Sequence, residues 1–352
     1  MSIFIALLVL SFLIFFHELG HFAVARWLGV KVEVFSIGFG KRFFTKKWGE
    51  TEFSLAWIPL GGYVRMKGQD DIDPSKQSTD SDSYSAKKPW ERIMILLGGP
   101  FANFLLAFLL FLIIYIAGMS ELGTKVNAIL PNSPAEKSGL IKGDIITSIN
   151  GKPVRFFDEL KEQIQSANGT VILGIKRSEQ SLTLTLNTKI MDNVNEFREK
   201  IKARMIGVSP DYNYRVEVSY GLFEALGRAW EKTVWSAGMI LRGIQKLIEG
   251  VVPAKEVGGI ISIVDFTSKA TETGIVVLLF MTALISVNLG VLNLLPIPAL
   301  DGGHIMLNLY EMITRKAPSE AILVRLTVMG WILLLGLMLL GTYNDINRLV
   351  GS

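Results

Sequence analysis

Two histidines and a glutamate stand together near the start of the chain, in the run His17-Glu18-Leu19-Gly20-His21. On a helix, residues four positions apart lie on the same face, one turn apart, so both imidazoles can bind one zinc ion. Glu18 is adjacent to the first histidine and can act as a general base toward an attacking water. The spacing therefore predicts part of a zinc hydrolase site, with two of its protein ligands and its base.

The rest of the sequence limits where a third protein ligand can come from. The chain has no cysteine, which excludes thiolate ligands and disulfides, and it has three histidines in all. The remaining histidine, His304, and the nearby Asp301 both lie in the run 293–304, Asn-Leu-Leu-Pro-Ile-Pro-Ala-Leu-Asp-Gly-Gly-His. We favour Asp301 as the third ligand, with His304 as a rival or as an outer partner that orients a ligand.

The same run predicts an interrupted helix. Pro296 and Pro298 break a helix, and Gly302 and Gly303 allow a tight turn. Non-helical backbone at membrane depth is tolerated where it lines a cavity inside the protein. Asn293 could hold the scissile carbonyl or its oxyanion there, or it could simply satisfy the backbone of the broken helix.

The elements that must carry these residues are membrane helices. Half of the 352 residues are hydrophobic, and they gather in four stretches that each exceed the roughly 20 apolar residues needed to cross a bilayer. The stretches are 3–27, 93–118, 274–300 and 321–343. The first lacks the basic start and cleavage site of a signal peptide, so we expect it to be retained. Ionisable groups are costly in lipid, so their presence in the first stretch indicates function.

Basic residues in the short loops predict how these helices are oriented. Lysine and arginine cluster between the first two stretches and again between the last two, which assigns those loops to the cytoplasm. Both termini and residues 119–273 then lie outside. His17 and Asp301 meet at similar depth near the cytoplasmic side. The net charge of +4, without a long basic run, argues against nucleic-acid binding.

The segment between the first two helices reads as β-structure followed by a loop. Residues 31–37 alternate, residues 53–66 are β-formers around Gly61 and Gly62, and residues 69–88 are polar. We therefore expect a β region that is more apolar than a cytosolic loop requires.

The long segment between the second and third helices reads as a soluble α/β domain followed by a helix. Turn signals divide residues 119–210, with a helix expected at 157–165 and strands at 171–175 and 182–186. Residues 222–249 have apolar positions at helical spacing. This pattern fits a helix on the membrane surface, and equally a helix packed in a soluble core.

With these motifs in place, the chain resembles the bacterial site-2 proteases, the RseP-like intramembrane zinc metalloproteases. Further matches are Ser36-Ile-Gly-Phe-Gly40, Gly61-Gly-Tyr-Val-Arg65, Gly99-Pro100, Asn103 and the run 131–143. The resemblance implies that His17, His21 and Asp301 bind Zn²⁺ and that Glu18 is the catalytic base. It also implies that residues 119–210 form a PDZ domain on the outer face.

For the β region, the resemblance implies that a hairpin over 53–67 dips into the membrane and pairs with an unwound substrate strand, with Gly61, Gly62 and Tyr63 at the contact. Three features depart from the family pattern. There is room for one PDZ domain where many relatives have two, Lys142 stands where proline is common, and the run 259–263 is Gly-Ile-Ile-Ser-Ile instead of Gly-Pro-Ile-Ser-Ile.

The sequence thus predicts an α-helical polytopic membrane protein with about four transmembrane helices, a membrane-associated β-hairpin region and one inserted α/β PDZ domain. The expected divisions are a first transmembrane helix at 1–28, a cytoplasmic-side β region and loop at 29–92, a second helix at 93–118, the PDZ domain at 119–212, membrane-surface helices at 213–273, a third helix at 274–304, and a loop and fourth helix at 305–352.

The expected function is intramembrane zinc proteolysis of pre-trimmed, single-span membrane proteins, such as anti-sigma factors or signal-peptide remnants. The expected location is the bacterial inner membrane, in contact with the lipid bilayer and without a nucleic-acid partner. Two alternatives remain at this point. One is a catalytically idle scaffold that holds partners through its PDZ domain, and the other is a metal transporter, which would need ionisable residues along its whole path.

Overall fold

A computed structural model describes residues 2–69 and 78–351 of the chain. The chain forms two compact units, which we describe separately. The helical unit consists of Met1–Ile114 and Phe223–Ser352, and the inserted unit is Tyr115–Leu222. The predicted polar loop at 69–88 includes residues 70–77, which lie outside the described residues.

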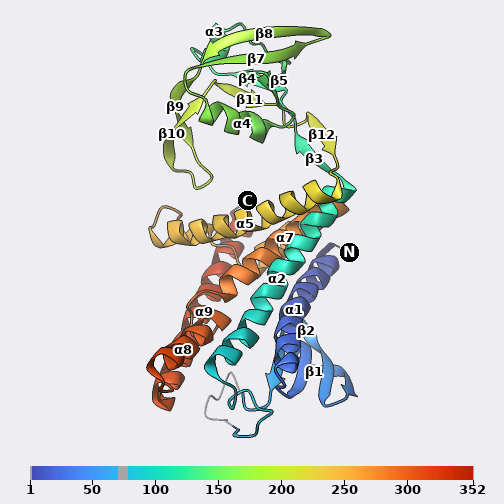
Figure 1. The fold of residues 1–352 in the computed structure, drawn as a ribbon, viewed down its shortest axis with the longest axis vertical. Coiled ribbons are helices and arrows are strands. Elements are labelled where there is room, and N and C mark those ends of the chain that lie inside the picture. Colours follow the sequence, from blue (N-terminus) through green and yellow to red (C-terminus); the bar gives the residue numbers. More distant parts are fainter. Residues whose placement is uncertain (1, 70–77, 352) are drawn as a thin grey trace. The chain divides into compact units, whose positions relative to one another are not determined.

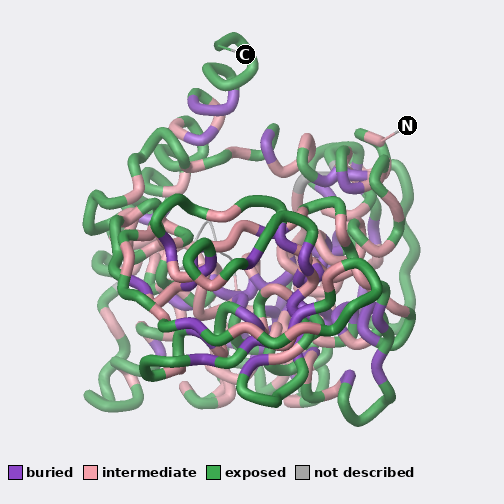
Figure 2. Tube along the Cα trace, turned by 90° about the horizontal axis from the view of Figure 1, so that it is seen from above, coloured by how far each residue is buried: buried purple, intermediate pink, exposed green. Residues whose placement is uncertain are grey.

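Four long apolar helices form the frame of the helical unit (Figure 1). They are α1 (Ser2–Trp27), α2 (Pro89–Ala117), α7 (Ile275–Asn293) and α9 (Glu320–Val350). Each is long and apolar enough to cross a membrane, as the sequence predicted. α9 is exposed along most of its length, and its buried residues include Asn344 and Asp345. Figure 2 shows a short buried stretch close to the C-terminal end of the chain.

The interruption predicted at Pro296 and Pro298 is confirmed, and only the continuous span given for the third helix, 274–304, is too long. α7 ends at Asn293, residues 294–300 are not helical, and a separate helix, α8 (Asp301–Thr314), begins at the predicted ligand. Pro296 and Pro298 explain the break, because neither can donate a helical hydrogen bond. The segment after 304, expected to be a loop, is therefore mostly helix, and the fourth helix continues past 343 to Val350.

The β region differs from the predicted hairpin over 53–67. It consists of β1 (Val32–Trp48) and β2 (Thr51–Met66), and the turn between them is at Gly49 and Glu50. Residues 34–37 pair on one side with 52–55 and on the other side with 62–65. Residues 62–65 therefore form an outer row of the sheet, and no other described strand pairs with its free edge.

A small apolar core fixes this sheet against α1 and α2. Its buried members come from the end of α1 and the residues after it, from both strands, from the loop before α2 and from α2 itself: Ala25, Val30, Val32, Met66, Tyr84 and Ile95. The buried hydroxyl of Thr51 also donates a hydrogen bond to the Val32 carbonyl at 2.8 Å. The sheet is thus held beside the helix that carries both histidines.

The helical unit is completed by elements that precede α7. They are α5 (Leu222–Ile248), a short 3₁₀ turn at Ala254–Glu256 and α6 (Ile260–Thr273). α6 packs against α1, α7 and α9. α5 is strongly amphipathic, and its exposed large apolar side chains include Phe223, Trp230 and Ile248.

The inserted unit is a small α/β fold, and its predicted helix and two predicted strands match α4 (Phe157–Ser166), β7 (Thr170–Arg177) and β8 (Gln180–Asn187). Its main sheet has the order β6-β5-β7-β8, and three further strand pairs are β4-β11, β9-β10 and β3-β12. The remaining elements are β3 (Met119–Leu122), β4 (Val126–Ile129), α3 (Pro134–Lys137), β5 (Ile145–Ile149), β6 (Lys152–Pro153), β9 (Lys189–Val194), β10 (Lys200–Met205), β11 (Val208–Pro210) and β12 (Arg215–Val218).

This unit has its own hydrophobic core, which includes Ile146, Leu160, Leu173 and Ile175. Its extent corrects the predicted boundary at 212, because β12 pairs with β3 and closes the unit at Leu222. The closing pair was missed because Arg215–Val218 is only four residues long.

Candidate metal centre

Three side-chain atoms converge in the helical unit. The Nε2 atoms of His17 and His21 are 3.2 Å apart, and the Asp301 Oδ2 atom lies 3.3 Å from the first and 3.4 Å from the second. Among the described residues, these three form the one group of histidine and acidic side chains with metal-ligand spacing. All three are largely enclosed, with side-chain exposures of 13%, 9% and 16%.

The triangle has the dimensions that zinc requires. Tetrahedral zinc, with bonds of about 2.0–2.1 Å to histidine nitrogen and carboxylate oxygen, holds its ligand atoms about 3.3 Å apart. The Asp301 Oδ2 atom is buried and has no hydrogen-bond partner in the described structure. A buried acceptor normally has a partner, so an oxygen left open toward two imidazoles fits a missing cation. The donor set therefore suits zinc.

The two histidines lie where α1 and α2 are in backbone contact. A Cβ added to Gly20 would lie 2.1 Å from the Gly98 carbonyl oxygen, so the helices can cross this closely only because both positions are glycine. A Cβ on Gly99 would lie 2.3 Å from the His21 Nε2 atom. Glycine at this position therefore leaves the space that the imidazoles occupy.

Each histidine has a different partner on the far side of its ring. The Nδ1 atom of His21 is 2.9 Å from the Ile95 carbonyl oxygen, which fixes its ring. The Nδ1 atom of His17 is 3.1 Å from the Nδ2 atom of Asn103. Asn103 lies in α2, is fully buried, and was noted in the sequence only as part of the family resemblance. A polar amide within the uncharged apolar stretch 93–118 is the signal that could have identified it.

Asp301 is presented by the start of α8. A Cβ on Gly302 would lie 2.3 Å from the Leu295 carbonyl oxygen, and one on Gly303 would lie 2.2 Å from the Ile297 carbonyl oxygen. Neither glycine adopts the left-handed conformation. The prediction of a tight turn at these glycines is therefore wrong, and they instead allow the broken segment to lie directly against α8.

The remaining predicted residues fall into two groups. The Asn293 Nδ2 atom lies 3.4 Å from the His17 Nε2 atom, so this side chain borders the cluster. His304 lies three residues after Asp301 on α8 and is outside the cluster of described ligand atoms. The geometry thus favours Asp301 over its rival as a ligand.

Glu18 and the outer row of the sheet face one another. A Cβ on Gly62 would lie 3.2 Å from the Glu18 Cγ atom and 3.0 Å from an Ile14 methyl carbon. Glycine at position 62 therefore lets the row pack against α1 beside the glutamate. The Tyr63 side chain makes its contacts within the sheet. Its hydroxyl accepts a hydrogen bond of 2.7 Å from the Arg42 Nη2 atom, and its ring stacks on Phe39.

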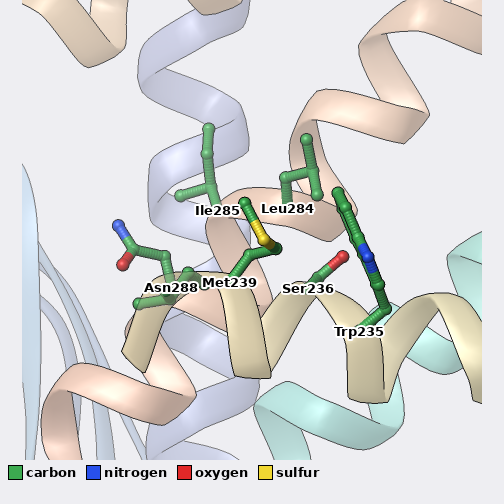
Figure 3. Close-up of a pocket in the computed structure, with 7 residues that line it drawn as sticks. Trp235, Ser236, Met239, Leu284, Ile285 and Asn288 are labelled. Carbon is green, nitrogen blue, oxygen red and sulfur yellow. The ribbon is translucent and has the colours of Figure 1, made fainter. Parts of the chain in front are cut away.

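A groove of about 320 Å³ in the helical unit lies between α5 and α7 and is separate from this cluster (Figure 3). Trp235, Ser236 and Met239 come from α5, and Leu284 and Asn288 come from α7. The groove has no titratable side chain in its lining. The groove therefore offers no side chain that could act as a general acid or base.

Comparison with known proteins gives one family. The model of peptidase family M50 matches residues 5–337 of the chain. A protein of Campylobacter jejuni, named as a zinc metalloprotease, is 47% identical over 98% of this chain and 93% of its own length. A Helicobacter pylori protein with the same kind of name is 40% identical over 98% of this chain and 99% of its own.

Among solved structures, the chain resembles the PDZ domain of an SdrC-like protein from Listeria monocytogenes. The match covers 26% of this chain and 90% of that chain, with 20% identity and a TM-score of 0.21.

Proposed function

Because the chain belongs to peptidase family M50, we propose that it cuts transmembrane segments of other proteins with a zinc ion held by His17, His21 and Asp301. The chain is a membrane protein and a zinc metalloendopeptidase of the site-2 protease type. The observation that carries the assignment of ligands is the triangle of 3.2, 3.3 and 3.4 Å, which matches tetrahedral zinc.

The chemical step needs a base, a Lewis acid and a positioned carbonyl. When bound, zinc activates water and polarises the scissile carbonyl. Glu18 takes a proton from the attacking water and passes it to the leaving amine nitrogen as the carbon–nitrogen bond breaks. Asn293, whose amide borders the cluster, donates a hydrogen bond to the carbonyl oxygen as negative charge develops on it.

The substrate is held as a strand along the outer row of the sheet. A transmembrane helix has no free backbone groups, so a segment must unwind before its peptide bond can be reached. Residues 62–65 offer a free strand edge beside Glu18, and main-chain hydrogen bonds there would replace those lost on unwinding. Gly61, Gly62 and Tyr63 lie at the proposed contact, where neither glycine adds a side chain and the Tyr63 side chain is engaged within the sheet.

The substrates we propose are single-span membrane proteins already trimmed outside, as in regulated intramembrane proteolysis. The inserted unit, as a PDZ domain on the outer side of the bacterial inner membrane, would exclude those with large outer domains. The exposed Trp230 and Ile248 of α5 support a position for this helix on the membrane surface. The basic loops that follow α1 and α8 support a metal centre near the cytoplasmic side, where His304 would act only as an outer partner.

The decisive experiment compares wild type, Glu18→Gln and Glu179→Gln in liposomes with a single-span substrate lacking its outer domain. Glu179 is a matched control because its side chain is 92% exposed on a turn of the inserted unit. We expect Glu18→Gln to keep zinc, measured by atomic spectrometry, and to cleave about 10²- to 10⁴-fold more slowly. Glu179→Gln should behave as wild type.

Equal cleavage by wild type and Glu18→Gln would overturn the role of Glu18. Wild-type protein without zinc and without cleavage would instead support the idle scaffold. A metal transporter would move zinc across the liposome membrane. Protein that binds zinc while no zinc crosses the membrane would contradict that alternative. Cleavage that persists on substrates with a large folded outer domain would remove the size-filter role while leaving the metal centre intact.

A further inference from the structure

The two histidines of the metal centre are held by partners of different chemical kinds. Both rings turn Nε2 toward the cluster and Nδ1 away from it. For His21, the partner of Nδ1 is the Ile95 carbonyl oxygen, which can only accept a hydrogen bond. Nδ1 of His21 must therefore carry the proton, and Nε2 is left with a lone pair for the metal.

For His17, the partner leaves the position of the proton open. The Asn103 amide is 3.1 Å from Nδ1, and an amide can either donate or accept. If Nδ2 donates to Nδ1, a neutral ring must carry its proton on Nε2, where it blocks metal binding. If the amide is turned so that Oδ1 accepts from Nδ1–H, Nε2 becomes a ligand. The two amide orientations have nearly the same shape, so the hydrogen bonds decide between them.

The surroundings of Asn103 indicate which orientation the metal-loaded protein needs. The side chain is fully buried, and its Oδ1 atom has no hydrogen-bond partner in the described structure. The Asn103 Oδ1 atom is thus a buried acceptor that needs a donor, and Nδ1–H of His17, on the far side of the ring from the ligand atom Nε2, needs an acceptor. The main chain at this position is also fixed, because Ser286 of α7 donates a hydrogen bond of 2.8 Å to the Asn103 carbonyl oxygen.

We propose that Asn103 is the positioning residue that sets the tautomer of His17, with its Oδ1 atom accepting from Nδ1–H so that Nε2 points a lone pair at the zinc. This inference rests on the proposed role of His17 as a ligand. It makes the two histidine ligands unequal. His21 is set by a main-chain carbonyl that no substitution removes, whereas His17 is set by a side chain and depends on its chemistry.

The test uses full-length protein in detergent and three variants. Asn103→Leu keeps the branched shape of the side chain and has no acceptor, Asn103→Asp keeps an acceptor, and Ser286→Ala removes the contact to the main chain without changing the amide. We expect Asn103→Leu to bind zinc about 10- to 100-fold more weakly, measured by competition with a chromophoric chelator. Asn103→Asp should bind within about threefold of wild type or more tightly, because an acceptor remains.

A spectroscopic readout separates positioning from packing. With cobalt in place of zinc, wild type and Asn103→Asp should give the strong visible bands of a tetrahedral site, and Asn103→Leu a weaker or shifted spectrum. Ser286→Ala should leave the spectrum and the affinity unchanged. If Asn103→Leu keeps wild-type affinity and spectrum, or if Asn103→Asp is impaired as much as Asn103→Leu, the tautomer role is wrong. Absence of zinc and cobalt from the wild type would contradict the proposed metal centre itself, which is a distinguishable failure.

Discussion

Asp144 of the inserted unit and Asp301 of the helical unit are enclosed carboxylates with opposite surroundings. Asp144 has its acceptors filled. Its Oδ1 accepts from the Arg177 Nε atom at 2.8 Å, and its Oδ2 accepts from the Arg177 Nη2 atom at 2.8 Å and the Ile141 N–H at 2.9 Å. The buried Oδ2 atom of Asp301 has no such bond and faces two imidazoles.

This contrast separates a carboxylate that stabilises a fold from one that binds a ligand. A buried charge that is paired and fully hydrogen-bonded needs nothing further. A buried charge with an open acceptor is a cost unless something positive occupies the space beside it. The hydrogen bonds made by a buried carboxylate therefore indicate its role better than its closeness to a motif in the sequence. The contrast can be tested by measuring zinc binding and cleavage for variants of both aspartates.

The largest effect is expected from Asp301→Ala. Removing one of three protein ligands should lower zinc affinity by more than the roughly 10- to 100-fold typical of outer partners, and cleavage should fall to background. Asp144→Ala should keep zinc and cleavage at the metal centre, because it removes an ion pair of the inserted unit. Zinc content and cleavage are measured on both purified variants. If Asp301→Ala retains zinc at wild-type affinity, Asp301 is not a ligand and His304 returns as the candidate.

The next effect concerns the space around the open site. A methyl group at Gly99 would lie 2.3 Å from the His21 Nε2 atom and 2.6 Å from the His17 Cε1 atom. Overpacking of this kind costs about 1–3 kcal/mol, so Gly99→Ala should weaken zinc binding by about 10- to 100-fold. Gly336→Ala in α9 is the matched control, because a Cβ there meets nothing within 4 Å. Equal affinities for the two variants would show that the imidazoles do not depend on this close approach.

The sequence was sufficient for those parts of the site that depend on short spacing. The four-residue separation of His17 and His21 determines their shared face in any helix, and apolar length alone identified four membrane helices. The choice of Asp301 followed from the scarcity of other ligands. These predictions needed no knowledge of how distant segments pack.

Predictions failed where a glycine has two possible uses. Gly302 and Gly303 suggested a tight turn, but both lie within α8 and serve the close approach of residues 294–300 to that helix. Local sequence does not distinguish these uses, because both need the absence of a Cβ. The contact of Asn103 with His17 spans 86 residues and depends on the helix crossing, which no local pattern encodes.

A smaller and purely structural effect is expected from Asp144→Asn. Burial raises the pKa of Asp144, but hydrogen bonds from Arg177 and Ile141 and the charge of Arg177 outweigh it, so the pKa lies below its ordinary value. Losing hydrogen bonds to a charged group should cost the inserted unit about 2–3 kcal/mol. Hydrogen exchange of the core segment around Ile146 and Leu173, in the full-length protein, measures this loss.

The pH dependence of the same unit gives an independent check of this ion pair. Because the folded-state pKa is lowered, the stabilisation is complete above the ordinary pKa of about 3.9 and is lost as the pH falls through the lowered value. Wild-type protection should therefore decline below about pH 4, and the contribution of this group should be missing from Asp144→Asn. A variant that declines as steeply as wild type would show that other carboxylates control acid unfolding.

The smallest effect on zinc binding is expected from an ion pair that joins α8, the helix that begins at Asp301, to α2. Glu311, ten residues further along α8, accepts a hydrogen bond of 2.7 Å from the Arg92 Nη2 atom of α2. The Arg92 side chain is 17% exposed and the Glu311 side chain is 21% exposed. This pair fixes the far end of α8 to the helix that also supplies Gly99 and Asn103. A partly exposed ion pair contributes up to about 1 kcal/mol, so Glu311→Gln or Arg92→Gln should weaken zinc binding by about fivefold or less. The reversed pair, Arg92→Glu with Glu311→Arg, should bind zinc more tightly than the sum of the losses in Arg92→Glu alone and Glu311→Arg alone, as measured in a double-mutant cycle. If the reversed pair is no better than the sum of the single variants, the ends of α8 and α2 are not coupled through these charges, and Asp301 is positioned only by the glycine contacts at its own end of the helix.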